Sequence, residues 1–181
     1  MNSSSFIALA LAAVLVFWMV GAYNRMVALR TAIGQAWAQV DEALRQRGTA
    51  AQSLIAALRE PLAAEHGALD AWQAALAEGL RAAAQMNTKP VVQAHAQAWV
   101  AAETAQAGAA SRVFALLDQH AALRGQEGVA GDAALWRDAQ AKLLFARQFF
   151  NAAAQPYNEA IALFPTRMLV PMFSFGPAGR L

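Results

Sequence analysis

Residues 136–164 read WRDAQAKLLFARQFFNAAAQPYNEAIALF, and this stretch decides the fold. Its apolar residues recur at alternating steps of three and four, the spacing of one face of a helix, and large side chains alternate with alanines. These seam positions are Trp136, Ala139, Leu143, Ala146, Phe150, Ala153, Tyr157, Ala160 and Phe164. Such a face interdigitates with neighbouring helices, so the stretch predicts a long bundle helix, with a local bend at Pro156.

The chain before this helix contains three more helical patterns. The first carries a stripe of apolar residues from Met26 to Leu44, with Arg30 and Arg47 in the same register, and we expect it to end at Gly48. Thr49 then caps a second helix that reaches about Gln85 and is kinked or broken at Pro61 and Gly67.

A third helix is expected to begin at Pro90 and to present a seam from Val92 to His120. The glycine-rich stretch Leu123–Gly131 connects it to the fourth helix, which Asp132 is suited to cap. No segment shows the period-two alternation of a strand. The sequence therefore predicts an all-α fold, with four helices packed up-down-up-down as an antiparallel four-helix bundle.

The N-terminal run Phe6–Tyr23, FIALALAAVLVFWMVGAY, contains no charged residue. It is at the short end for a helix that crosses a ~30 Å hydrocarbon core, and Trp18 and Tyr23 suit the interface. The alternative is a cleaved signal peptide, since Val20-Gly21-Ala22 resembles a small-residue cleavage site. Residues 1–5 lack Lys and Arg and the helical pattern continues unbroken, so we interpret the run as an uncleaved transmembrane helix.

Arg25 and Arg30 follow this span, and no basic residue precedes it, so the positive-inside rule predicts an outside N-terminus and a cytoplasmic bundle. The expected divisions are an extracytoplasmic N-terminus at 1–5, the transmembrane helix at 6–23, the bundle at 24–165 and an apolar tail at 166–181. The tail, which contains Met168, Leu169, Met172 and Phe173, would lie near the bilayer because the fourth helix returns toward it. Two interpretations stay open: packing against the bundle, or contact with the membrane or a partner.

Composition excludes several function classes. Net charge is +2 with acids and bases interspersed, which argues against a nucleic-acid partner. The absence of cysteine excludes disulfides, thiol catalysis and thiolate metal sites. His66, His95 and His120 form no metal motif, since the last two are roughly 37 Å apart along one helix. We find no triad and no phosphate-binding glycine motif, so the expectation is a non-enzyme without catalytic, cofactor-binding or metal-binding residues.

Asparagines that follow an aromatic residue are the most distinctive polar feature. Asn24 lies at the membrane end of the first helix, and Asn151 and Asn158 are one heptad apart. Near a bundle seam such residues set register, the alternative being a polar ligand site between helices.

Two other sets of side chains are expected to be structural. Asp41 and Glu42 are expected to pair with Arg45 or with Arg47 on their own helix. The tryptophans are expected in the core rather than in a binding cage. They are Trp37, Trp72, Trp99 and Trp136.

Both ends of the bundle region resemble the LemA family. The opening matches in order and spacing at Tyr23-Asn24-Arg25, Leu29-Arg30, Ala36-Trp37, Gln39-Val40-Asp41 and Leu44-Arg45-Gln46-Arg47. The close matches at Ala146-Arg147, Phe150-Asn151, Tyr157-Asn158, Ile161, Phe164-Pro165 and Phe173-Ser174-Phe175. Residues 49–131 match only in helical character. Gln140 stands where the family has an acidic residue, and Phe150 stands where it has tyrosine.

The resemblance implies a single-pass protein of the bacterial cytoplasmic membrane, with a cytoplasmic helical bundle. Family members often neighbour genes for TPM-domain proteins or membrane zinc peptidases, which implies envelope or stress-linked assemblies. We therefore expect a scaffold or adaptor that binds protein partners. The alternatives are a membrane- or lipid-stress sensor that acts through the apolar tail and, for assembly, a dimer along alanine-rich seams.

Overall fold

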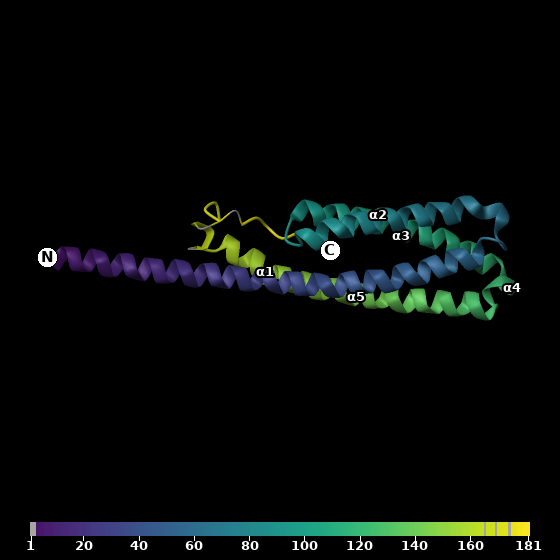
Figure 1. Ribbon diagram of the computed structural model, residues 1–181, viewed down its shortest axis with the longest axis horizontal. Coiled ribbons are helices and arrows are strands. Elements are labelled where there is room, and N and C mark those ends of the chain that lie inside the picture. Colours follow the sequence, from purple (N-terminus) through teal and green to yellow (C-terminus); the bar gives the residue numbers. More distant parts are fainter. Residues whose placement is uncertain (1–2, 165, 169, 174) are drawn as a thin grey trace.

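The computed structural model describes residues 3–164, 166–168, 170–173 and 175–181. Within this part the chain is helical and has no strand, which confirms the all-α prediction. The elements are α1 (Ser3–Leu58), η1 (Ala63–Glu65), α2 (His66–Thr88), α3 (Gln93–Gln119), α4 (Ala121–Arg124), α5 (Glu127–Ala162) and η2 (Thr166–Met168). The long helices α1, α2, α3 and α5 form the predicted antiparallel bundle, with α4 at the end far from the N-terminus (Figure 1).

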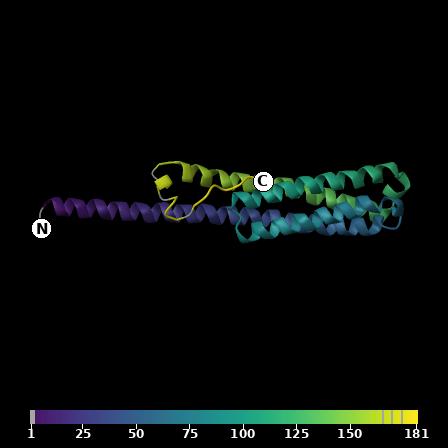
Figure 2. The ribbon, with the colours of Figure 1, turned by 90° about the horizontal axis from the view of Figure 1, so that it is seen from above.

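One end of α1 projects alone beyond the bundle (Figures 1 and 2). None of the side chains from Phe6 to Arg25 is buried, and Met26 is the first buried residue. By length and composition, α1 is the one helix of the described chain that could cross a membrane. The projecting part contains the apolar run Phe6–Tyr23. Met1 and Asn2, which precede it, lie outside the described part.

The expected break at Gly48 is wrong, because α1 continues through it to Leu58. Thr49 does not cap a new helix, and its hydroxyl instead donates to the Arg45 carbonyl at 3.1 Å. A glycine inside a helix costs only about 1 kcal/mol, whereas Leu44 and Leu54, on either side of Gly48, are both buried. The chain turns instead over residues 59–65, around Pro61, and Gly67 lies in the first turn of α2.

Two later boundaries also differ from the prediction. The third helix begins at Gln93, three residues after Pro90, and Val92 and His120 at its ends are exposed. The fourth helix, α5, begins at Glu127 rather than after Asp132, so Gly128 and Gly131 are helical. It continues through Pro156, and the predicted seam residues Leu143, Phe150 and Tyr157 are fully buried. The seam prediction is wrong for Phe164, which lies beyond the helix end at Ala162 and is 80% exposed.

The closest helix pairs are α1 with α5 and α2 with α3, whereas α3 and α5 make few close backbone approaches. Alanines explain the first pair. Buried alanines recur every seven residues on α1 at Ala36, Ala43 and Ala50, and on α5 at Ala139, Ala146 and, after fourteen, Ala160. Small side chains let the backbones of α1 and α5 approach closely. The wider spacing between neighbouring helices is found between α3 and α5.

Two hydrophobic clusters fill the bundle. The cluster nearer the projecting helix contains Trp37, Trp99 and Tyr157, and the distal cluster contains Trp72 and Leu117. Each cluster contains residues from all four long helices, and the two clusters meet in the middle of the bundle, where Arg47 lies on α1.

Candidate functional site

A buried ion pair connects α1 to α3 at the middle of the bundle. Arg47 is 4% exposed and Glu103 is 8% exposed. The two terminal nitrogens of Arg47 donate to the two carboxylate oxygens of Glu103, each at 2.7 Å. This is the paired fork geometry that gives arginine–carboxylate bonds their strength and direction.

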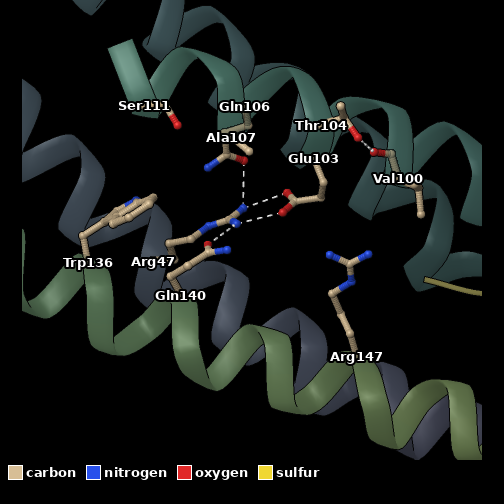
Figure 3. A pocket seen from close by; sticks show the side chains of 10 residues that line it. All are labelled: Arg47, Val100, Glu103, Thr104, Gln106, Ala107, Ser111, Trp136, Gln140 and Arg147. Atoms are coloured by element: carbon tan, nitrogen blue, oxygen red, sulfur yellow. Dashed lines mark hydrogen bonds and ion pairs between the residues drawn. The ribbon is translucent and has the colours of Figure 1, made fainter. Parts of the chain in front are cut away.

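Two glutamines complete a polar layer with this ion pair. Arg47 also donates to the side-chain oxygens of Gln106 on α3 and Gln140 on α5, each at 2.8 Å. Figure 3 shows the three helices contributing to the layer. The fourth helix, α2, contributes Gly79, where an added Cβ would lie 3.3 Å from the Gln106 oxygen. The absence of a side chain at Gly79 therefore gives the layer its space.

A cavity of about 400 Å³ adjoins this layer between α3 and α5. Its walls are Arg47, Val100, Glu103, Thr104, Gln106, Ala107, Ser111, Trp136, Gln140 and Arg147. Large side chains hold the two helices apart on either side of it: Phe114 lies 4.8 Å from Trp136 between ring centroids, and Trp99 lies under Arg147. The wide α3–α5 spacing is therefore filled at both ends and open in the middle.

Arg147 gives the cavity its net charge. It rises from α5 toward α3 (Figure 3), and its guanidinium carbon lies 5.4 Å from the centroid of the Trp99 ring. Among the described residues it forms no ion pair, whereas the charge of Arg47 is matched by Glu103. The lining thus holds two cations and one anion.

The alternative in which Arg47 pairs with an acid on its own helix is wrong. Arg45 does pair with Asp41 on α1, as expected, but Arg47 crosses the bundle to Glu103 instead of pairing with Asp41 or Glu42. The informative signal was the register of Arg47, which places it in the buried stripe with Leu44. Glu103, Gln106 and Gln140 were not singled out, because nothing local in the sequence links them to a residue on another helix.

The paired asparagines of α5 hold the C-terminal end of the chain. The Asn151 amide donates to the Leu181 carbonyl at 2.8 Å and accepts from the Leu181 backbone N–H at 2.9 Å. Asn158 makes the same two bonds with Ala178, at 3.0 and 2.8 Å. Their use is therefore structural, but they bind the tail rather than set register or form a ligand site. Asn24 is exposed and far from this clamp in the sequence.

The heptad between the two asparagines matches the length of the tail that they bind. Seven residues of helix rise about 10.5 Å, and three extended residues, from Ala178 to Leu181, span about 10 Å. Two residues before Ala178, the Gly176 carbonyl accepts from the Tyr157 hydroxyl at 2.9 Å. Burial raises the pKa of Tyr157, an effect that the nearby Arg30 opposes.

The tail lies where the projecting part of α1 begins. Tyr23 packs against Phe173 at 5.0 Å and Phe175 at 6.3 Å between ring centroids, and Arg30 lies over Phe175 at 5.5 Å. Packing against the bundle, one of the two interpretations of the tail, holds for its last residues, since Phe175 and Ala178 are buried in the proximal cluster. Leu163, Phe164, Met168 and Met172 remain exposed. Pro165, Leu169 and Ser174 lie outside the described residues.

The histidines do not come together in a site. His66 and His120 each bond a nearby backbone carbonyl at 2.8 Å, and His95 is half-buried near the start of α3. In the described ranges no group of three His, Cys, Asp or Glu residues could hold a metal ion. Trp37, Trp72 and Trp99 are buried in the core, as expected, and Trp136 packs against it.

A sequence model of the LemA family matches residues 36–180. The matched region includes the polar layer, the asparagine clamp and nearly all of the tail. No curated protein matches the chain.

Proposed function

Because this chain belongs to the LemA family, we propose that it is a non-enzymatic scaffold or adaptor anchored in the bacterial cytoplasmic membrane. The observation that carries the anchor is α1, a single helix of 56 residues whose apolar part projects from the bundle with no buried side chain. A buried core helix would have this composition but not this exposure. The proposed orientation places the N-terminus outside and the bundle in the cytoplasm, because Arg25 and Arg30 follow the span.

Dual reporters test both anchor and orientation. A fluorescent protein and a phosphatase that is active only in the periplasm are fused separately after Leu181. Fluorescence in the membrane fraction without phosphatase activity is the expected result. Phosphatase activity would contradict the orientation, and a reporter in the soluble cytoplasmic fraction would contradict the anchor.

An uncovered apolar surface on α5 supports a scaffold. Phe145 is 61% exposed and Phe149 is 47% exposed, and their rings pack edge to face at 4.7 Å. Beside them a groove between α1 and α5 includes Ala38, Gln39 and Lys142. Exposed aromatic residues next to a shallow groove are typical of protein-binding surfaces.

Crosslinking in native membranes tests the scaffold. The double variant Phe145→Ser, Phe149→Ser should lose a crosslinked partner that the unchanged chain captures. Leu80→Ser is the matched control, since Leu80 is 51% exposed on α2, away from this surface. If both variants keep the partner, or both lose it, the α5 surface is not the binding site.

Membrane contact through the tail is the second candidate, and the exposed residues beside Tyr23 favour it. Met168 and Met172 in the tail, and Leu163 and Phe164 just before it, are 64% to 80% exposed, and Phe173 in the same segment packs against Tyr23. Deletion of the tail would be a poor test, because Phe175 and Ala178 belong to the core. A lipid-contact sensor is tested better with the two methionines replaced by glutamine in the whole chain. A changed response to bilayer composition is expected, and an unchanged response would contradict this candidate.

A further inference from the structure

We propose that the cavity between α3 and α5 binds a small molecule that carries a carboxylate or phosphate group. The proposal goes beyond the scaffold role and does not depend on it, since it concerns the space between α3 and α5 and not the exposed aromatic surface of α5. It stands on three features: buried donors without acceptors, an unmatched cation, and space of the right size.

The first feature is the hydrogen-bonding chemistry of the walls. Three lining residues have a buried nitrogen without a partner: Nε of Arg47, Nε2 of Gln106 and Nε1 of Trp136. All three are donors, and no buried oxygen of the described lining residues lacks a partner. A buried donor without an acceptor is destabilising by about 1–3 kcal/mol. Acceptor oxygens placed within reach of these nitrogens would remove this penalty, whereas further donors would not.

The orientation of Gln106 strengthens this point. Its oxygen accepts from Arg47 at 2.8 Å, which directs its nitrogen away from the ion pair (Figure 3). Gln106 is 2% exposed, so bulk water does not reach the side chain freely. The Arg47–Glu103 pair therefore holds a fixed donor in place in the cavity wall.

The second feature is the positive charge of Arg147. Its guanidinium carbon lies 5.4 Å from the centroid of the Trp99 ring, a contact with the π-face that does not use the N–H donors. Glu103 is paired with Arg47, and no ion pair joins it to Arg147 in the described part of the chain. Arginine forks suit carboxylate and phosphate oxygens, so the charge selects an anionic group.

The third feature is size. A volume of about 400 Å³ lies within the range of small-molecule sites. Water alone would occupy it as roughly a dozen molecules at ~30 Å³ each. An occupied cavity would join α3 to α5, two helices that make few close backbone approaches to each other.

Calorimetry on the detergent-solubilised full chain tests the proposal. Inorganic phosphate and succinate are titrated separately at ionic strength held constant with sodium chloride, and the melting temperature is followed in parallel. Binding of either anion, with a higher melting temperature than chloride alone produces, is expected. A response to phosphate only or to succinate only identifies which of the two anionic groups the cavity prefers. No binding of either would overturn the proposal and leave a water-filled cavity.

Variants locate the binding. Arg147→Gln should weaken binding about tenfold or more, since it removes a charged hydrogen bond. Arg137→Gln is the matched control, because Arg137 is another arginine of α5 that lies over an aromatic ring of α3, Phe114 at 5.1 Å, but it does not line the cavity. Equal weakening by both would show a general charge effect and overturn the proposal.

A second variant separates loss of binding from loss of folding. Ala107→Phe leaves every charge in place and fills the cavity from an exposed position on α3. It should abolish binding while the helical circular dichroism is retained. Unchanged binding by a folded Ala107→Phe protein would place the anion elsewhere.

Discussion

Arg47 shows how a single buried charge can determine the register in which two helices pack. Taking an ion pair out of water costs several kcal/mol per ion, which the attraction between the charges only roughly repays. The pair with Glu103 therefore adds little net stability relative to apolar side chains of similar size. Its larger effect is to disfavour other registers of packing, because any shift of α1 against α3 would leave both charges buried without a partner.

Removing one partner of a buried ion pair is far more costly than replacing both. Glu103→Leu alone should lower the free energy of unfolding by about 3–5 kcal/mol, since it leaves Arg47 buried and unpaired. The double variant Arg47→Met, Glu103→Leu should recover most of that loss. Denaturant unfolding of the detergent-solubilised chain, followed by tryptophan fluorescence, measures both. Additive losses in the double variant would contradict a coupled pair.

Tyr157 predicts a dependence on alkaline pH. Its pKa is raised above the ordinary value of about 10, because burial disfavours the phenolate. The raised pKa means that its contribution to stability is complete below pH ~10 and is lost as the pH rises through the folded-state pKa. Ionisation also removes the proton that the hydroxyl donates to Gly176.

The chain contains two tyrosines, so Tyr23→Phe leaves Tyr157 as the single phenol. Ultraviolet titration of this variant should give a midpoint above that of free tyrosine. Unfolding the protein in denaturant should return the midpoint to the ordinary value. A midpoint that is the same in the folded and unfolded states would contradict burial as the cause.

At the scale of the element, α1 is continuous although its sequence contains a glycine in the middle. No atom lies within 4 Å of a Cβ added at Gly48, so an alanine there meets no obstacle. Gly48→Ala should therefore stabilise the protein by about 0.5–1 kcal/mol, measured by denaturant unfolding. Gly79→Ala is the control inside another helix, and should destabilise, because its Cβ would crowd the Gln106 oxygen bound to Arg47. A loss at Gly48 would mean that the helix needs flexibility there.

The C-terminal tail is the second element whose behaviour can be predicted. Asn151→Ala removes both bonds to Leu181, so the tail should detach more often and trypsin should cleave faster after Arg180. Asn151→Asp should behave in the same direction, since a carboxylate cannot donate to the Leu181 carbonyl. Asn24→Ala, at the exposed asparagine, should leave the cleavage rate unchanged. Equal rates in all variants would show that the clamp does not hold the tail.

Periodicity predicted the helices and their buried faces well, because burial repeats with the helix. The seam of α5 is the clearest case, with Leu143, Phe150 and Tyr157 all fully buried. Local signals failed at Gly48 and Thr49, where packing on both sides outweighs a weak helix-breaking tendency. The cavity and the tail clamp were not predictable in this way, because Arg47 and Glu103 are 56 residues apart and Asn151 and Leu181 are 30 apart.

At the scale of the whole molecule, the helices differ in length, and this difference shapes the membrane-facing end. α5 has 36 residues, whereas α2 has 23 and α3 has 27, so part of the α1–α5 pair extends beyond the other two helices. The tail runs back along this part and covers Tyr157, and ends against α3, where Gly179 lies close to Ala96. The C-terminal residues thus cover the part of the α1–α5 pair that α2 and α3 do not reach.

The same geometry predicts two heights above the bilayer. From Tyr23 to Leu58 the helix rises about 53 Å, so α4 stands about that far from the surface, while Phe173, the neighbour of Met172 in the chain, packs against Tyr23. Because the chain lacks cysteine, Gly125→Cys and Met172→Cys each carry one dye. Energy transfer to labelled lipids should be strong from position 172 and weak from position 125. Equal transfer would mean that the bundle lies along the membrane.

A helix that is unbroken from end to end also acts as a lever. If α1 pivots where it enters the lipid, a change in tilt of about 20°, within the usual range for membrane helices, swings its far end by about 18 Å. A rotation about the helix axis is likewise carried to every turn, because no hinge lies between Tyr23 and Leu58 to absorb it. Small changes in bilayer thickness would therefore be amplified into large movements at the tip of the bundle.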